Sequence, residues 1–314
     1  MKTTAGNKIT NRGPLVHTYS IVARDPATGE MGVAVQSHWF SVGTKVSWAQ
    51  AGVGAIATQS FINADFGPEG LKLLAAGLSA EEASAQLLAQ DDGAEFRQLA
   101  VVDSRGDVAA FTGSKCVAEA GHYVGDNFSV QANLMLSDTV WPVMAQAFEA
   151  ATGRLAERMV GALKAAQAEG GDIRGKQSAA LLVVRGRPTG QSWRDRLIDL
   201  RVDDASQPVT ELERLLSVHR AYEYMNDGEQ KLEANQVDEA LEAYRKAADL
   251  YPTNPETTFW YGVTLASAGQ VAQAMPLFSA VFEKDDNWRT VVERMVAAGV
   301  LQLDKETLAR IANA

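Results

Sequence analysis

The chain has 314 residues, which predicts about two domains, and its 46% hydrophobic and 22% charged residues are typical of a globular protein. A net charge of −10 argues against a general nucleic-acid-binding protein, which would carry a basic face. One cysteine excludes an internal disulfide, and the longest apolar run is too short to cross a membrane, so we expect a cytoplasmic protein without a membrane span.

Residues 1–17 contain three basic side chains, Lys2, Lys8 and Arg12, and no continuous apolar run. They therefore lack the pattern of a secretory signal sequence. We expect them to form a flexible N-terminal extension before a domain that begins at residue 18.

Residues 18–35 predict a strand, a tight turn and a second strand. Apolar side chains alternate along the first strand at Tyr19, Ile21 and Ala23, which is the period of a β-strand. The turn ends at Gly29, which takes a positive φ at no steric cost. The hairpin is the first folded element that the sequence predicts.

The next elements alternate between strands and pairs of helices. Two helical blocks, 68–88 and 138–170, are each expected to divide into two helices, and Ser79 with Glu82 forms a capping-box pattern inside the first block. This order predicts an α+β fold, a four-layer αββα sandwich whose facing strands are rich in small residues. The further strands are expected at 46–50, 55–59, 98–103, 108–112, 128–133, 178–184 and 197–202.

A polar stretch from 201 to 213 predicts a boundary between a domain of residues 18–206 and a second of residues 207–314. The second part repeats with a period of 34 residues, which is typical of tetratricopeptide repeats. Residues 288–314 are expected to close the repeat with one or two helices. The repeated pairs are Gly228 and Gly262, Ala240 and Ala274, Tyr244 and Phe278, and Ala247 and Val281.

Several motifs of the first part resemble one bacterial family, the domain of unknown function 1028, over about residues 18–203. This family is grouped with the N-terminal-nucleophile (Ntn) hydrolases, so the resemblance implies an Ntn-like sandwich and a candidate mechanism, but no known substrate. The motifs are Ser37–Gly43, Ala49–Gln59, Phe66–Gly70, Val130–Asn133 and Asp172–Leu182.

The resemblance points to Thr18 as the nucleophile. An Ntn hydrolase uses the hydroxyl of its first residue to attack an amide and the α-amine of that residue as the base. Here the chain would have to be cut between His17 and Thr18. The alternative is that Thr18 is an ordinary β-branched strand residue. Ser20, on the same face of the strand, is a second candidate.

Other polar residues are predicted to lie around the nucleophile. Ser37 and His38 end the second strand, from which they can reach the first, although His38 can equally be a structural histidine. Asp172 with Arg174 is either a clamp for a substrate carboxylate or a structural ion pair. The remaining candidates for substrate binding are Gln59, Gln131, Asn133 and Ser178, and the three amides can instead tie the sheets together because a buried amide needs partners.

Two functions follow from these patterns. The first is an Ntn-type amidohydrolase that acts on a small amide or peptide-like bond. The second is a non-catalytic scaffold whose repeat domain binds a protein, a peptide or a peptidoglycan-like partner. For either one we expect a homo-oligomer without a cofactor, because no paired Cys or His spacing indicates a metal.

Overall fold

The computed structural model describes residues 13–314, which divide into two compact units. The first unit extends to Arg214 and the second covers Leu215–Ala314. The division falls inside helix α7 (Pro208–Glu233), whereas the sequence predicts the boundary before this helix.

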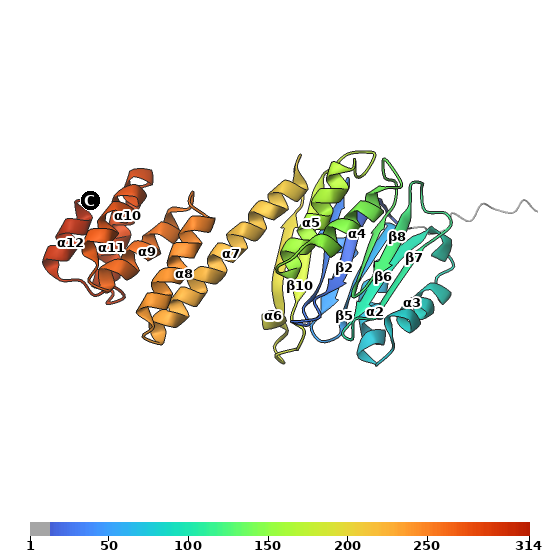
Figure 1. Ribbon diagram of the computed structural model, residues 1–314, viewed down its shortest axis with the longest axis horizontal. Helices are drawn as coiled ribbons and strands as arrows, with labels where there is room; N and C mark the ends of the chain where they lie inside the picture. The colour runs from blue at the N-terminus through green and yellow to red at the C-terminus, as the bar shows by residue number, and fades with distance from the viewer. Residues whose placement is uncertain (1–12) are drawn as a thin grey trace, which may run out of the picture. The chain divides into compact units, whose positions relative to one another are not determined.

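The first unit contains two antiparallel sheets packed face to face (Figure 1). One sheet has the order β1-β5-β6-β7, with β4 also paired to β5, and the other has the order β11-β10-β3-β2-β9-β8. The first consists of β1 (Leu15–Val16), β4 (Ser47–Gln50), β5 (Gly54–Phe61), β6 (Arg97–Asp103) and β7 (Val108–Thr112). The second consists of β2 (Thr18–Arg24), β3 (Met31–Ser37), β8 (Gly121–Gly125), β9 (Phe128–Ala132), β10 (Ser178–Val184) and β11 (Arg196–Val202).

Helices cover the outer face of each sheet (Figure 1). Helices α2 (Phe66–Ala75) and α3 (Ala80–Ala89) pack on the first sheet, and α4 (Val140–Ala150) and α5 (Leu155–Ala168) pack on the second. The predicted capping box is present, since Glu82 N–H donates to Ser79 Oγ and Ser79 N–H donates to the Glu82 carboxylate. The predicted four-layer αββα sandwich is therefore confirmed.

The layer between the sheets is built from small side chains, as the sequence predicts. Val22 and Val33 from the second sheet pack against Ala55 and Ala57 of the first, and all four are fully buried. Thr18 and Ser20 share the inward face of β2 with Val22, because side chains two residues apart point the same way. Both hydroxyl groups therefore point between the sheets.

The residues before Thr18 differ from the flexible extension that the sequence suggests. Residues 1–12 lie outside the described residues, but Leu15–Val16 form strand β1 and pair with Ser60 and Phe61 of β5. Ile62 N–H also donates to the Pro14 carbonyl oxygen (2.9 Å). Two residues are too few to show a strand period, which explains why β1 was not predicted.

Four other short elements were also not predicted. Strand β8 is the edge partner of β9, and its half-exposed Gly-rich sequence has little apolar alternation. The other three are single turns of helix, namely α1 (Gly43–Val46), η1 (Ala94–Phe96) and α6 (Ser192–Asp195).

All the regular secondary structure of the second unit is helical. Each of the two repeats consists of two consecutive helices, and two further helices follow the second repeat, as expected. In the first repeat Gly228 lies against the ring of Tyr244, and in the second Gly262 lies near Phe278. Its helices are the later part of α7, α8 (Val237–Leu250), α9 (Pro255–Ser267), α10 (Val271–Lys284), α11 (Asn287–Ala297) and α12 (Lys305–Ala312).

Candidate functional site

The peptide bond between His17 and Thr18 is buried where β1 passes into β2. Both residues are almost completely inaccessible to solvent. The Thr18 hydroxyl donates to the Val16 carbonyl oxygen (2.9 Å), and the Thr18 carbonyl accepts from the Asn133 backbone N–H (3.1 Å). In the intact chain the hydroxyl of the predicted nucleophile is therefore enclosed.

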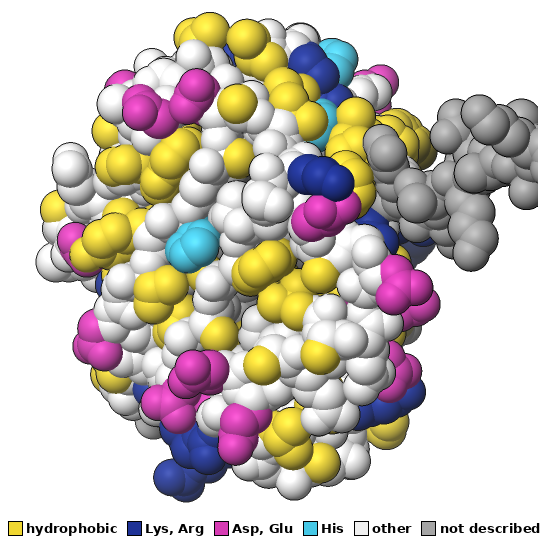
Figure 2. All heavy atoms as spheres, turned by 90° about the vertical axis from the view of Figure 1, so that its right-hand side faces the viewer, with side chains coloured by type: hydrophobic (Ala, Val, Ile, Leu, Met, Phe, Trp, Pro, Cys, Tyr) yellow, Lys and Arg dark blue, Asp and Glu magenta, His cyan; other side chains and the backbone are white. Residues whose placement is uncertain are grey.

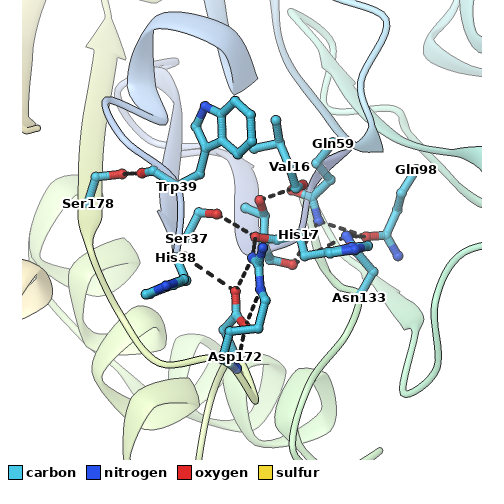
Figure 3. A network of polar contacts seen from close by, with 12 residues as sticks. Val16, His17, Ser37, His38, Trp39, Gln59, Gln98, Asn133, Asp172 and Ser178 are labelled. Carbon is cyan, nitrogen blue, oxygen red and sulfur yellow. Dashed lines mark hydrogen bonds and ion pairs between the residues drawn. The ribbon is translucent and has the colours of Figure 1, made fainter. Parts of the chain in front are cut away.

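The His17 carbonyl oxygen, which belongs to this peptide bond, accepts two hydrogen bonds from side chains (Figure 3). The Ser37 hydroxyl donates one of them, and Arg174 Nη2 donates the other at 3.1 Å. Ser37 can do so because it pairs directly with Thr18 in the β2–β3 ladder. A hydroxyl and a guanidinium thus converge on one carbonyl oxygen.

Asp172 holds this guanidinium in place. Its carboxylate accepts from Arg174 Nε (3.0 Å) and from Nη2 (2.7 Å), a two-point contact that fixes the plane of the guanidinium. The Asp172 side chain is fully buried, whereas that of Arg174 is 29% exposed. The predicted cluster therefore forms an ion pair directed at the His17 carbonyl.

The His17 side chain fills a pocket of its own beside this bond. Its Nδ1 lies 2.6 Å from Asn133 Oδ1, and its ring meets the edge of Phe61. Asn133 Nδ2 donates to Gln98 Oε1 (2.8 Å), so Asn133 Oδ1 is the acceptor and His17 Nδ1 carries the hydrogen. Burial lowers the pKa of His17, although the hydrogen bond to Asn133 opposes the shift. The pocket therefore favours a neutral imidazole.

The three predicted amides lie between the sheets in a connected network. Gln59 Nε2 donates to Gln98 Oε1 (2.7 Å), and Ser20 Oγ donates to Gln59 Oε1 (2.6 Å) while accepting from Gln131 Nε2 (2.6 Å). In this form of the chain they tie the sheets together. Gln98 joins both branches of the network but was not among the predicted residues. Its place in an apolar strand, like that of Gln59, was a signal that could have identified it.

The two remaining candidates lie to one side of the His17 carbonyl. The Ser178 hydroxyl donates to the Trp39 carbonyl and accepts from Val42 N–H (3.1 Å), so it holds the loop after β3. His38 donates its backbone N–H to Asp172 Oδ2 (3.3 Å), and Figure 3 shows its exposed ring turned away from His17. Ser37 therefore contacts the carbonyl, whereas the neighbouring imidazole does not.

Figure 2 shows that on the face at the right of Figure 1 Lys and Arg side chains are interspersed with Asp and Glu. Within residues 13–314 there is no cluster of three or more His, Cys, Asp or Glu side chains suited to a metal ion. In the same residues, no helix combines the length and the apolar character that a membrane span requires.

Comparisons with known proteins agree with this architecture. Residues 18–212 match the model described as "Family of unknown function (DUF1028)", and residues 231–298 match a tetratricopeptide repeat model. The structure resembles the crystal structure of a DUF1028 protein from Silicibacter pomeroyi, with 33% identity and a TM-score of 0.58. This similarity covers 64% of the present chain and 84% of the other.

No curated protein matches the chain. The family match covers most of the chain and agrees with the resemblance that the motifs indicate. The chain therefore belongs to the DUF1028 family and carries a tetratricopeptide repeat region after the family domain.

Proposed function

We propose that the DUF1028 domain is the precursor of an Ntn-type amidohydrolase that matures by cleavage between His17 and Thr18. The observation that carries this proposal is the pair of donors on the His17 carbonyl oxygen, Ser37 Oγ and Arg174 Nη2. Hydrogen-bond donors that are already positioned at the oxygen where negative charge develops stabilise the transition state of acyl transfer.

Maturation would begin with attack of Thr18 Oγ on the His17 carbonyl carbon. The C–N bond then breaks, the nitrogen keeps the bonding pair and takes up the hydroxyl proton, and an ester joins His17 to Thr18 Oγ. Water hydrolyses this ester, which releases residues 1–17 as a carboxylic acid and restores the hydroxyl. Ser37 and Arg174 would stabilise the oxyanion that forms before each bond breaks.

The product would have Thr18 as its first residue, with a free α-amine next to its hydroxyl. That amine can take the hydroxyl proton during attack on a substrate amide and return it to the leaving amine. Asp172 would act through Arg174, because it contacts the guanidinium and not the carbonyl. The substrate would be an amide or a peptide bond.

Mass spectrometry of the purified full chain after prolonged incubation at neutral pH tests this proposal, together with N-terminal sequencing. A chain that begins at Thr18 supports it, and Thr18→Ala must then stay intact. Thr18→Ser keeps a hydroxyl and should still be cut. A wild-type chain that remains intact under conditions that preserve its fold would refute self-cleavage.

Two observations favour the second function. The Thr18 hydroxyl is enclosed and already bonded to Val16, and the family domain is joined to repeats of a type that commonly bind proteins. In this alternative the intact chain is the final form, and the repeat unit recruits a protein or a peptide. Pull-down with the full chain and with Tyr222→Ala, which alters an exposed residue of α7, would identify such a partner.

A further inference from the structure

The segment before the bond to be cut is bound in the manner of an extended peptide ligand. Gly13 lies against Ile62, where a Cβ would come within 2.2 Å of the carbonyl oxygen. Pro14 O accepts from Ile62 N–H (2.9 Å), and Leu15 and Val16 pair with β5. Val16 is completely buried, so the domain holds this segment through side chains as well as backbone.

The side chain of the last residue of the segment is buried in a pocket formed by Asn133 and Phe61, and Figure 3 shows its contact with Asn133. Asn133 Oδ1 accepts a hydrogen from the His17 ring, and Phe61 lies against that ring. Asn133 cannot offer its amino group instead, because the two hydrogens of that group are directed to Gln98 Oε1 (2.8 Å) and to the Thr18 carbonyl oxygen (3.4 Å). The pocket therefore suits a flat, neutral side chain that donates a hydrogen bond, and it disfavours a carboxylate.

Maturation and turnover pass through the same kind of covalent species. In both, an acyl group is joined as an ester to Thr18 Oγ, and water releases it. The acyl group of the maturation ester is the peptide that ends in Leu15, Val16 and His17. The ester formed from a substrate must fit the same surroundings, so the segment shows which acyl groups the domain can hold.

We infer that the mature site takes extended peptides as acyl donors, bound as an added strand on β5 with a histidine at the position of His17. This inference rests on the proposed function and names its substrate class. The backbone of β5 would provide affinity by pairing, and the pocket formed by Asn133 and Phe61 would provide selectivity.

Hydrolysis of four fluorogenic aminocoumarin amides by the matured protein, residues 18–314, tests the inference, after fragment 1–17 has been removed by gel filtration. The reference is acetyl-Gly-Pro-Leu-Val-His amide. Two relatives end in Phe or Asp instead of His, and the fourth is acetyl-His amide without the strand residues. We expect kcat/KM for the reference to exceed that of each other amide at least tenfold.

Failure of the proposed function and failure of this inference give different results. A wild-type chain that stays intact would overturn the proposed function and this inference together. A chain that matures but hydrolyses the four amides at similar rates, or prefers the Asp amide, would overturn only the inference. As a further check, the free acid Gly-Pro-Leu-Val-His should inhibit the matured protein competitively, and the matched peptide that ends in Asp should inhibit at least tenfold more weakly.

Discussion

Thr18 and Ser37 lie directly opposite each other in the antiparallel pair of β2 and β3. Side chains opposite each other in such a ladder share a face, so the Ser37 hydroxyl is brought beside the peptide bond that precedes Thr18. The ladder itself therefore fixes the donor on the His17 carbonyl oxygen. A slip of one residue in this register would turn Ser37 to the other face of the sheet.

Replacing Ser37 by Ala should slow cleavage before Thr18 about 10²–10³-fold, because loss of one oxyanion donor has an effect of this size in acyl transfer. Arg174 would remain on the carbonyl. The measurement is the rate at which intact chain disappears by mass spectrometry. Ser178→Ala is a matched control, since it also removes a buried hydroxyl bonded to a backbone carbonyl, but at Trp39. Equal slowing by both variants would argue against a specific role for Ser37.

Asp172→Asn should destabilise the fold as well as slow cleavage. The buried carboxylate holds Arg174 at two points, and removing one partner of a buried pair costs about 3–5 kcal/mol. Because Arg174 is partly exposed, we expect a loss near the lower end of this range. Urea unfolding of the wild type and the variant at pH 7 measures the difference. An unchanged midpoint would show that the pair contributes nothing to stability.

The intact chain should lose stability in acid because the buried His17 imidazole becomes protonated on unfolding. Burial lowers the pKa of His17 below its ordinary value of 6.5, so the unfolded chain binds the proton more readily. The stability from neutral His17 is therefore complete above about pH 6.5 and is lost as the pH falls, by at most about 1.4 kcal/mol per pH unit.

Urea unfolding of wild type and His17→Asn at pH 7.5, 6.5 and 5.5 isolates this contribution. Asn keeps a hydrogen-bond donor but does not titrate, so its stability should fall less steeply. The pKa of His122 is also lowered by burial, but that residue is present in both chains and cancels in the difference. Parallel curves for the two chains would contradict the assignment.

The sequence predicted the layers of the fold better than the details of the site. Strands with clear alternation and helices with caps were identified, because those signals are local. The two donors on the His17 carbonyl come from Ser37 and Arg174, which meet only through strand pairing and a loop. Ser37 and Arg174 were both among the candidates taken from the sequence, but whether a buried amide such as Gln59 contacts a substrate or another strand depends on tertiary packing, which no local pattern encodes.

The two repeat glycines should respond differently to substitution by Ala. A Cβ at Gly228 would lie 2.8 Å from the Tyr244 ring, whereas a Cβ at Gly262 would lie 3.5 Å from its nearest neighbours. Ala favours a helix by about 1 kcal/mol over Gly. Gly262→Ala should therefore keep or raise the thermal midpoint of the repeat unit, and Gly228→Ala should lower it. Calorimetry measures both, and equal midpoints would show that Tyr244 moves aside without cost.

Two buried glutamines should also respond in opposite directions to replacement by Leu. Gln98 Oε1 is the nearest acceptor of the Gln59 and Asn133 amino groups, whose other acceptors lie 3.3–3.4 Å away. Gln98→Leu therefore leaves both buried groups with weak hydrogen bonds only, at a cost of about 1–3 kcal/mol. Gln36 is equally buried on β3, but both its side-chain polar atoms lack a hydrogen-bond partner. Gln36→Leu removes these unsatisfied groups and should stabilise the chain by about 1–2 kcal/mol. Urea unfolding of the two variants at one pH tests the contrast.

A loss of stability in both variants would contradict the prediction for Gln36. It would mean that Gln36 is hydrogen-bonded in solution, through water between β3 and α5, because replacing an amide by an apolar side chain of similar size lowers stability only where the amide has partners.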